Sequence, residues 1–234
     1  MAYSSVAQLI DHSLLHPAVT DADIEAGCRL ADQYRVKTVC VKPYCIPKVK
    51  EILRHSPVGI CAVVGFPHGN SSTEMKLRET QEALNAGASE IDMVINIGKA
   101  KSGAWDYVKA EISFLQKTCA RKSALLKVIF ENDFLMDEEI VRLCEICNEV
   151  RPAFVKTSTG YGFVKQADGS YNYKGATEHH VQLMRRHCTA SVQIKAAGGI
   201  RTLDDLLKFR DLGCARIGAT ATEAILEEAR KRGL

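Results

Sequence analysis

The hydrophobic pattern of the chain changes repeatedly between two periods. Short runs of β-branched and apolar residues, typical of buried strands, are separated by stretches in which apolar residues recur at helical spacing. In one such stretch Val108, Ile112 and Leu115 fall on a single helix face. The strand-like runs cover residues 38–41, 60–64, 91–95, 125–130, 153–156, 192–195 and 215–218, with a weaker first run around 9–14.

Buried strands that alternate with single helices predict a parallel sheet covered by helices. An open, doubly wound sheet and a closed barrel both use this alternation. Eight repeats in 234 residues favour closure, and no dinucleotide-binding glycine fingerprint follows the first strand. We therefore expect an α/β protein, a single-domain (β/α)8 TIM barrel over residues 1–234 with a short N-terminal segment.

Turn and capping residues agree with this order of elements. Ser71-Ser72-Thr73-Glu74 reads as a capping box that opens one helix, and Gly87 and Gly213 stand where helices end before the next strand. The polar stretch 162–175 is the longest irregular segment. Because it follows the sixth strand, on the side where barrels keep their active sites, we expect a functional loop or lid there.

Charge and cysteine content narrow the class of partner. The net charge of +3 comes from 31 basic and 28 acidic residues of mixed order, which argues against nucleic-acid and membrane partners but allows a small anionic substrate. The chain carries neither a signal-peptide pattern nor an apolar run of membrane-spanning length. Nine cysteines without a disulfide pattern fit a reducing compartment, so we expect a cytoplasmic protein.

Charged residues break the apolar strands at several points. Asp92 interrupts the fourth strand, Lys127 and Glu131 bracket the fifth, Lys156 closes the sixth and Lys195 closes the seventh. Isolated buried charges are costly, but lysines and carboxylates gathered in one cavity compensate one another. One interpretation is a structural network of ion pairs that fills the mouth of the barrel.

The alternative is lysine chemistry. A second cationic lysine and partial desolvation both disfavour the charged form of an amine, so Lys156 beside Lys195 could attack a carbonyl at neutral pH. Asp92 could then carry protons to and from the intermediates, directly or through a water. The residues alone leave both interpretations open.

Glycines and hydroxyls follow three strands in a row and suggest a phosphate site. Lys156 precedes Thr157-Ser158-Thr159-Gly160, Lys195 precedes Ala196-Ala197-Gly198-Gly199, and the last strand leads into Gly218-Ala219-Thr220. The loops after the last two strands are the usual phosphate site of barrels.

Metal centres and redox motifs find little support in the sequence. Cys144 and Cys147 form a lone Cys-x-x-Cys within a helical pattern, which we interpret as structural. The histidines lack metal-ligand spacing, and we expect surface or loop positions for His179 and His180. We therefore expect no metal.

The sequence resembles the deoxyribose-phosphate aldolase family over nearly its whole length. The motifs that carry the resemblance occur in order and are residues 10–15 (IDHSLL), 64–69 (VGFPHG), 90–98 (EIDMVINIG), 155–160 (VKTSTG), 194–202 (IKAAGGIRT) and 216–218 (RIG). Any one of them could arise by chance, but their order and spacing together make the match specific.

The resemblance implies a (β/α)8 barrel that needs no cofactor or metal and forms dimers or tetramers. Lys156 would be the Schiff-base nucleophile, Lys195 the lysine that perturbs it, and Asp92 the proton-relay carboxylate. The reaction would be reversible cleavage of 2-deoxy-D-ribose 5-phosphate to D-glyceraldehyde 3-phosphate and acetaldehyde, in the breakdown of deoxynucleosides. The phosphate would bind at Gly160, Gly198, Gly199, Gly218 and Thr220.

Departures from the family pattern spare Asp92, Lys156 and Lys195. His16 stands where many relatives have lysine, and Thr220 is a single hydroxyl where some carry two serines. Two alternatives stay open at this stage: a phosphosugar-binding barrel without catalytic activity, and a lysine-dependent aldolase for another sugar phosphate.

Overall fold

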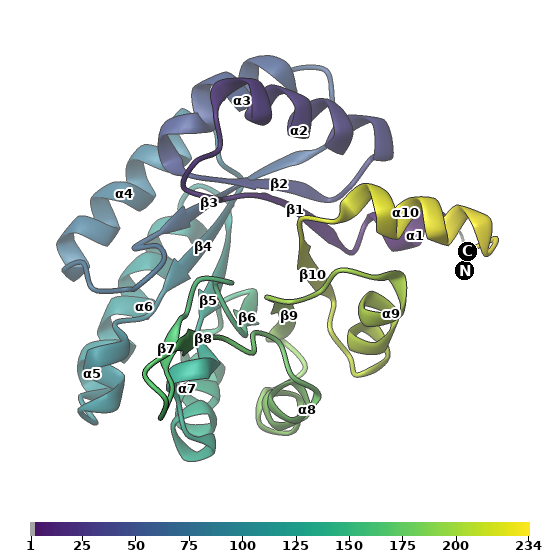
Figure 1. The fold of residues 1–234 in the computed structure, drawn as a ribbon. Coiled ribbons are helices and arrows are strands. Elements are labelled where there is room, and N and C mark those ends of the chain that lie inside the picture. Colours follow the sequence, from purple (N-terminus) through teal and green to yellow (C-terminus); the bar gives the residue numbers. More distant parts are fainter. Residues whose placement is uncertain (1–2) are drawn as a thin grey trace.

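The computed structural model describes residues 3–234 and shows a closed barrel of eight parallel strands (Figure 1). Neighbours follow the order β1-β10-β9-β6-β5-β4-β3-β2, and β10 closes the barrel against β1. The predicted barrel is confirmed, with all eight strands where the apolar runs indicated. The strands are β1 (Ile10–Leu14), β2 (Thr38–Val41), β3 (Gly59–Val64), β4 (Glu90–Val94), β5 (Leu125–Ile129), β6 (Phe154–Lys156), β9 (Gln193–Ala197) and β10 (Arg216–Ala219).

Helices cover the outside of the barrel, as Figure 1 shows. The principal ones are α2 (Asp21–Tyr34), α3 (Ile46–Ile52), α4 (Thr73–Ala86), α6 (Trp105–Ala120), α7 (Asp137–Val150), α8 (Glu178–His187), α9 (Leu203–Asp211) and α10 (Thr222–Lys231). Shorter elements are α1 (Tyr3–Ala7), α5 (Ile97–Lys101) and the 3-10 turns η1 (Pro43–Cys45) and η2 (Asn132–Phe134). None of the helices in residues 3–234 is both long and apolar enough to cross a bilayer.

Alternation along each strand separates the core from the site. Ile91 and Met93 of β4 are buried in the large apolar cluster between strands and helices, as are Val128 and Val155 of the next strands. Because successive side chains of a strand point to opposite faces, the residues between them point into the barrel. The strand register then places Asp92 beside Lys127, and Lys156 beside Lys195.

The interior differs from one side of the barrel to the other. On β2 and β3 the inward residues Cys40, Cys61 and Val63 form a small apolar cluster with Leu15. The strands from β4 round to β10 instead carry charged inward residues. The barrel is therefore apolar on one inner wall and ionic on the other.

Two local predictions need correction. The cap of α4 is Ser72, whose side chain accepts from the amide of Met75, so the predicted box that began at Ser71 lies one residue too early. Lys195 does not close its strand, because β9 continues to Ala197.

The segment 162–175 is also more ordered than predicted. Its strands β7 (Val164–Lys165) and β8 (Tyr171–Asn172) pair in antiparallel fashion. A tight turn joins them, in which Gly169 has φ of +84° and Asp168 Oδ1 accepts from the amide and hydroxyl of Ser170.

Candidate active site

Asp92 is the centre of a buried group of lysines. Its Oδ2 atom is 2.8 Å from Nζ of Lys156 and 2.8 Å from Nζ of Lys195. Its Oδ1 atom is 2.7 Å from Nζ of Lys127. The three residues predicted to be catalytic therefore meet, with Lys127 as a third lysine to which no role was assigned.

A second set of charges lies against this group. Lys195 Nζ is 2.5 Å from Asp11 Oδ2, and Lys127 Nζ is 2.5 Å from Glu90 Oε2. Arg216 contacts both carboxylates, at 2.6 Å from Asp11 and 2.9 Å from Glu90. Within the described residues this network, which we call the lysine–carboxylate network, contains the cations Lys127, Lys156, Lys195 and Arg216 and the carboxylates Asp11, Glu90 and Asp92.

Mutual pairing fixes the charge states of most members. Burial opposes ionisation of Asp92, but Lys127, Lys156 and Lys195 together hold its pKa well below the ordinary range. Burial likewise opposes the charge on Lys195, yet Asp11 and Asp92 raise its pKa above the ordinary lysine range. Lys195 is therefore a fixed cation beside Lys156.

A cavity of about 460 Å³ opens above the network. Lys156 lines it, and so do all five predicted phosphate-binding residues, Gly160, Gly198, Gly199, Gly218 and Thr220. Asp92 and Lys195 do not reach its wall and lie behind Lys156. Lys156, itself only 3% exposed, is thus the lysine of the network that meets the cavity.

Backbone geometry explains the glycines of the cavity. Gly160, Gly198 and Gly199 all have positive φ, between +81° and +90°, where other residues are strained. A hydroxyl joins two of the loops, because Thr157 Oγ1 donates to the carbonyl of Ala197 and accepts from its amide, both at 3.1 Å.

The start of α10 adds to the anion-binding character of the cavity. The helix begins at Thr222 and is capped by Ala221, which follows Thr220 and whose side chain cannot accept from the first-turn amides. Such amides and the helix dipole favour an anion. Beneath them His12 is hydrogen-bonded to Thr222 at 2.8 Å, and burial lowers the pKa of His12 to about 4.

Glu131 is a residue of the site that sequence reasoning noticed but left without a role. It accepts hydrogen bonds from the amide and the hydroxyl of Thr159, in the loop between Lys156 and Gly160. Burial raises the pKa of Glu131 to about 7, although the bonds from Thr159 oppose this shift. Its φ of +60° turns the chain sharply after β5 and brings the carboxylate back to that loop.

The cavity also has lining residues for which the sequence predicted no role. Ser13, His16, Tyr161 and Arg201 line the cavity beside the predicted residues. Arg201 stands two residues after Gly199 and places a cation beside the expected phosphate site. The exposed His68, in the motif of residues 64–69, is not among the lining residues of this cavity.

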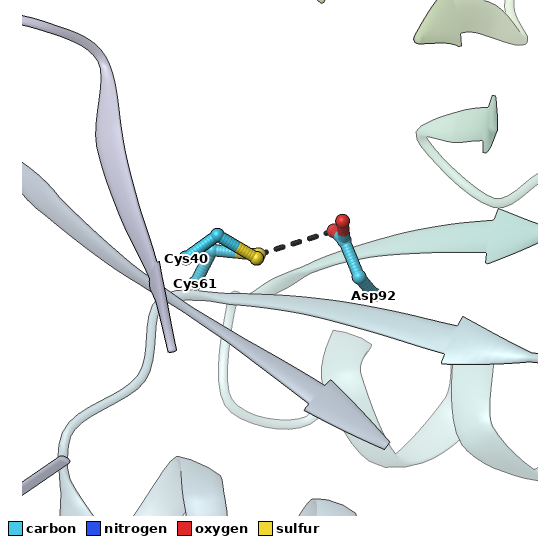
Figure 2. Close-up of side chains that lie close together, drawn as sticks. All are labelled: Cys40, Cys61 and Asp92. Atoms are coloured by element: carbon cyan, nitrogen blue, oxygen red, sulfur yellow. Dashed lines mark hydrogen bonds between the residues drawn. The ribbon is translucent and has the colours of Figure 1, made fainter. Parts of the chain in front are cut away.

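Two thiols lie next to Asp92, as Figure 2 shows. Cys40 and Cys61 face each other on β2 and β3 with their sulfurs 3.7 Å apart, and Cys61 donates to Asp92 Oδ1 at 3.1 Å. This trio has the ligand types of a metal site. However, Asp92 already pairs with the cations Lys127 and Lys195, which repel a dication, so we interpret the thiols as packing and hydrogen-bonding partners of Asp92.

Comparison with known proteins agrees with the site. A sequence model described as DeoC/LacD family aldolase matches residues 5–222. Deoxyribose-phosphate aldolase of Rhodopirellula baltica is 44% identical over 98% of this chain and 91% of its own. That of Thermococcus gammatolerans is 41% identical over 98% and 99%, respectively.

A solved structure repeats the likeness in three dimensions. The tetrameric deoxyribose phosphate aldolase of Aeropyrum pernix superposes with a TM-score of 0.87 at 28% identity, covering 99% of this chain and 93% of its own. Motif order, barrel, buried lysines and glycine-lined cavity all point the same way, and the chain belongs to the DeoC/LacD family of aldolases.

Proposed function

We propose that this protein cleaves 2-deoxy-D-ribose 5-phosphate reversibly to D-glyceraldehyde 3-phosphate and acetaldehyde, with Lys156 as the Schiff-base nucleophile. The observation that carries the proposal is the position of Lys156. Of the three lysines that contact Asp92, it is the one that lines the cavity. Lys127 and Lys195 lie behind it, where a substrate carbonyl cannot reach them.

The network places a cation beside the proposed nucleophile. Its described members are four basic and three acidic side chains. Lys195 is held charged by Asp11 and Asp92 and supplies the neighbouring cation that disfavours a second ammonium.

The reaction begins when the amine of Lys156 adds to C1 of the open-chain sugar to give a carbinolamine. Loss of water, with proton transfer through Asp92 and Lys195, forms a protonated imine. Asp92 then takes the proton of the C3 hydroxyl, directly or through a water, as the C2–C3 bond breaks. The electron pair of that bond moves into the imine to form an enamine, C3 becomes the aldehyde carbon, and glyceraldehyde 3-phosphate leaves. Protonation of the enamine and hydrolysis release acetaldehyde and restore the amine.

The phosphate of the substrate is assigned to the glycine-lined part of the cavity. Gly160, Gly198, Gly199 and Gly218 bring backbone amides to that part, and Thr220 adds a hydroxyl beside the start of α10. Anchoring of the phosphate there directs C1 toward Lys156. The same anchoring would favour a phosphorylated sugar over an unphosphorylated one.

We also propose that the enzyme serves deoxynucleoside breakdown in the cytoplasm as a homo-oligomer. All nine cysteines are free and buried thiols, which fits a reducing compartment. The related Aeropyrum pernix enzyme is described as tetrameric, which supports assembly of several chains.

Reductive trapping tests the nucleophile. Borohydride added with deoxyribose 5-phosphate should attach the reduced sugar or acetaldehyde fragment to the peptide that contains Lys156, as mass spectrometry would show. Lys156→Arg should abolish this adduct, whereas Lys165→Met, on the exposed hairpin, should leave it intact. Full inactivation with an unmodified Lys156 would refute the assignment.

A substrate panel tests the rest of the proposal. Turnover should be highest on deoxyribose 5-phosphate compared with ribose 5-phosphate and fructose phosphates. Binding without imine formation would instead identify a phosphosugar-binding barrel. Preference for a keto sugar phosphate would identify a different lysine-dependent aldolase.

A further inference from the structure

Two helices bring potential metal ligands together outside the cavity. Asp137 is the first residue of α7, and His179 and His180 lie in the first turn of α8. Nε2 of His179 is 2.7 Å from Oδ2 of Asp137, and the two imidazole centroids are 5.4 Å apart. One ligand atom from each residue lies within 4.8 Å of the others.

The surroundings of this cluster suit a cation. Nδ1 of His180 is buried and has no hydrogen-bond partner among the described residues, so a donor atom is left unused. Asp133 adds a second carboxylate nearby, while Lys174 is the nearby cation that opposes it. The side chains of Asp137 and His179 are about half exposed, which leaves the cluster open to solvent.

We propose that Asp137, His179 and His180 form a binding site for a divalent transition metal such as Zn²⁺. Two imidazoles and one carboxylate suit Zn²⁺, Co²⁺ and Ni²⁺ better than Mg²⁺ or Ca²⁺, which prefer oxygen ligands alone. Zinc holds such ligands at about 2.0–2.2 Å. Small rotations of the half-exposed His179 and Asp137 side chains can meet that requirement, with water completing the coordination.

The position of the site gives the metal a structural role near the active site. It would tie α7 to α8 across 42 residues of sequence. Asp133, just before α7, accepts hydrogen bonds from the amides of Lys174 and Gly175, just before α8, at 3.0 and 2.9 Å. The next residue, Ala176, donates its amide to the carbonyl of Gly198 in the cavity wall. A bound metal therefore braces the segment that supports the phosphate loop and takes no part in the reaction.

Calorimetric titration of the full chain, without a polyhistidine tag, with ZnCl2 tests the site. We expect one equivalent to bind, and His179→Ala should weaken binding at least about tenfold. His187→Ala, an exposed histidine at the end of the same helix, should leave binding unchanged. Unchanged affinity in His179→Ala, or no binding at all, would overturn the proposal.

Cobalt distinguishes this site from the buried thiols. Co²⁺ held by imidazole and carboxylate lacks the thiolate-to-cobalt charge-transfer absorption that ligation by Cys40 and Cys61 would produce. We expect the spectrum of bound Co²⁺ to lack that absorption. The spectrum should also lose intensity in Asp137→Asn. A thiolate spectrum would place the metal elsewhere and refute the site. Because these readouts measure binding alone, they stand apart from the test of aldolase activity.

Discussion

Asp92 shows how a single carboxylate can organise a site. Its Oδ2 atom is shared by Lys156 and Lys195, so the two ammonium groups cannot be farther apart than the sum of two 2.8 Å contacts. Proximity of like charges is the simplest way to make one lysine nucleophilic. Lys195 differs from Lys156 because it also pairs with Asp11 and does not line the cavity.

Replacement of Lys195 by Met should therefore lower kcat by about 10²-fold or more. Without Lys195, Oδ2 of Asp92 contacts Lys156 alone, and the site loses both the neighbouring cation and one member of its proton relay. Steady-state rates on deoxyribose 5-phosphate would measure this loss. Lys165→Met provides the control for loss of a lysine, and near-normal turnover in Lys195→Met would exclude Lys195 from the mechanism.

Glu131 and His12 should contribute opposite pH dependences to stability. The folded pKa of Glu131 is about 7, above the ordinary 4.5, so the folded state binds the extra proton and the free energy of unfolding falls as pH rises through this window. The folded pKa of His12 is about 4, below the ordinary 6.5, so its contribution is present above pH 6.5 and is lost as pH falls toward 4. Each residue contributes about 3 kcal/mol to the free energy of unfolding over its window.

Urea midpoints from pH 4.5 to 8 would separate the two effects. Relative to the unchanged protein, Glu131→Gln should gain stability as pH rises from 4.5 to 7. His12→Asn should lose relative stability as pH rises from 4.5 to 6.5. Parallel curves for a variant and the unchanged protein would show that the replaced group does not titrate in that window.

Some residues of the lysine–carboxylate network could be predicted from the sequence, and others could not, for a physical reason. Asp92, Lys156 and Lys195 were predictable because a charge within an apolar strand is costly unless it is compensated. Asp11 and Arg216 sit near strand starts, where a charge is ordinary, and only barrel closure brings them together across 205 residues. The Asp137–His179–His180 cluster could not be predicted, because only folding brings the start of α7 against the start of α8.

At the scale of elements, the loops that follow the strands determine the cavity. The order of strands and helices could be predicted from periodicity alone, but the β7–β8 hairpin could not, since each of its strands has only two residues. Side-chain contacts stabilise it, because Phe163 packs edge-on against Tyr173 with ring centroids 5.4 Å apart. Both rings also line the cavity, which places the hairpin at its mouth.

The segment after the hairpin should influence phosphate binding without touching the substrate. Gly175 has φ of +70°, and a Cβ atom there would lie 2.6 Å from the carbonyl oxygen of Gly198. Gly175→Ala should therefore displace the Gly198–Gly199 loop and raise KM by about tenfold, with a smaller change in kcat. Steady-state kinetics would measure this, with Gly169→Ala as the control at a positive-φ glycine that has open space around it. Equal effects in both variants would indicate backbone strain alone.

For the whole molecule, the lysine–carboxylate network is also what fills the ionic half of the barrel. Arg216 on β10 reaches Asp11 on β1 and Glu90 on β4, so its contacts cross the barrel interior as well as the closing seam. The count of eight strands was predictable from the sequence. Which residues meet across the interior was not, because that depends on the stagger of all the strands together.

Arg216→Met should destabilise the protein by about 3–5 kcal/mol, because it leaves buried carboxylates with fewer partners. Arg216→Lys keeps the charge but loses the two-pronged contact with Glu90, so its loss should be intermediate. Urea unfolding would show lower midpoints with an unchanged slope. Lys109→Met, which breaks a surface pair with Glu149, provides the control and should leave the midpoint nearly unchanged. If Arg216→Met and Lys109→Met had similar midpoints, the network would serve catalysis alone, and apolar packing would have to hold the barrel closed.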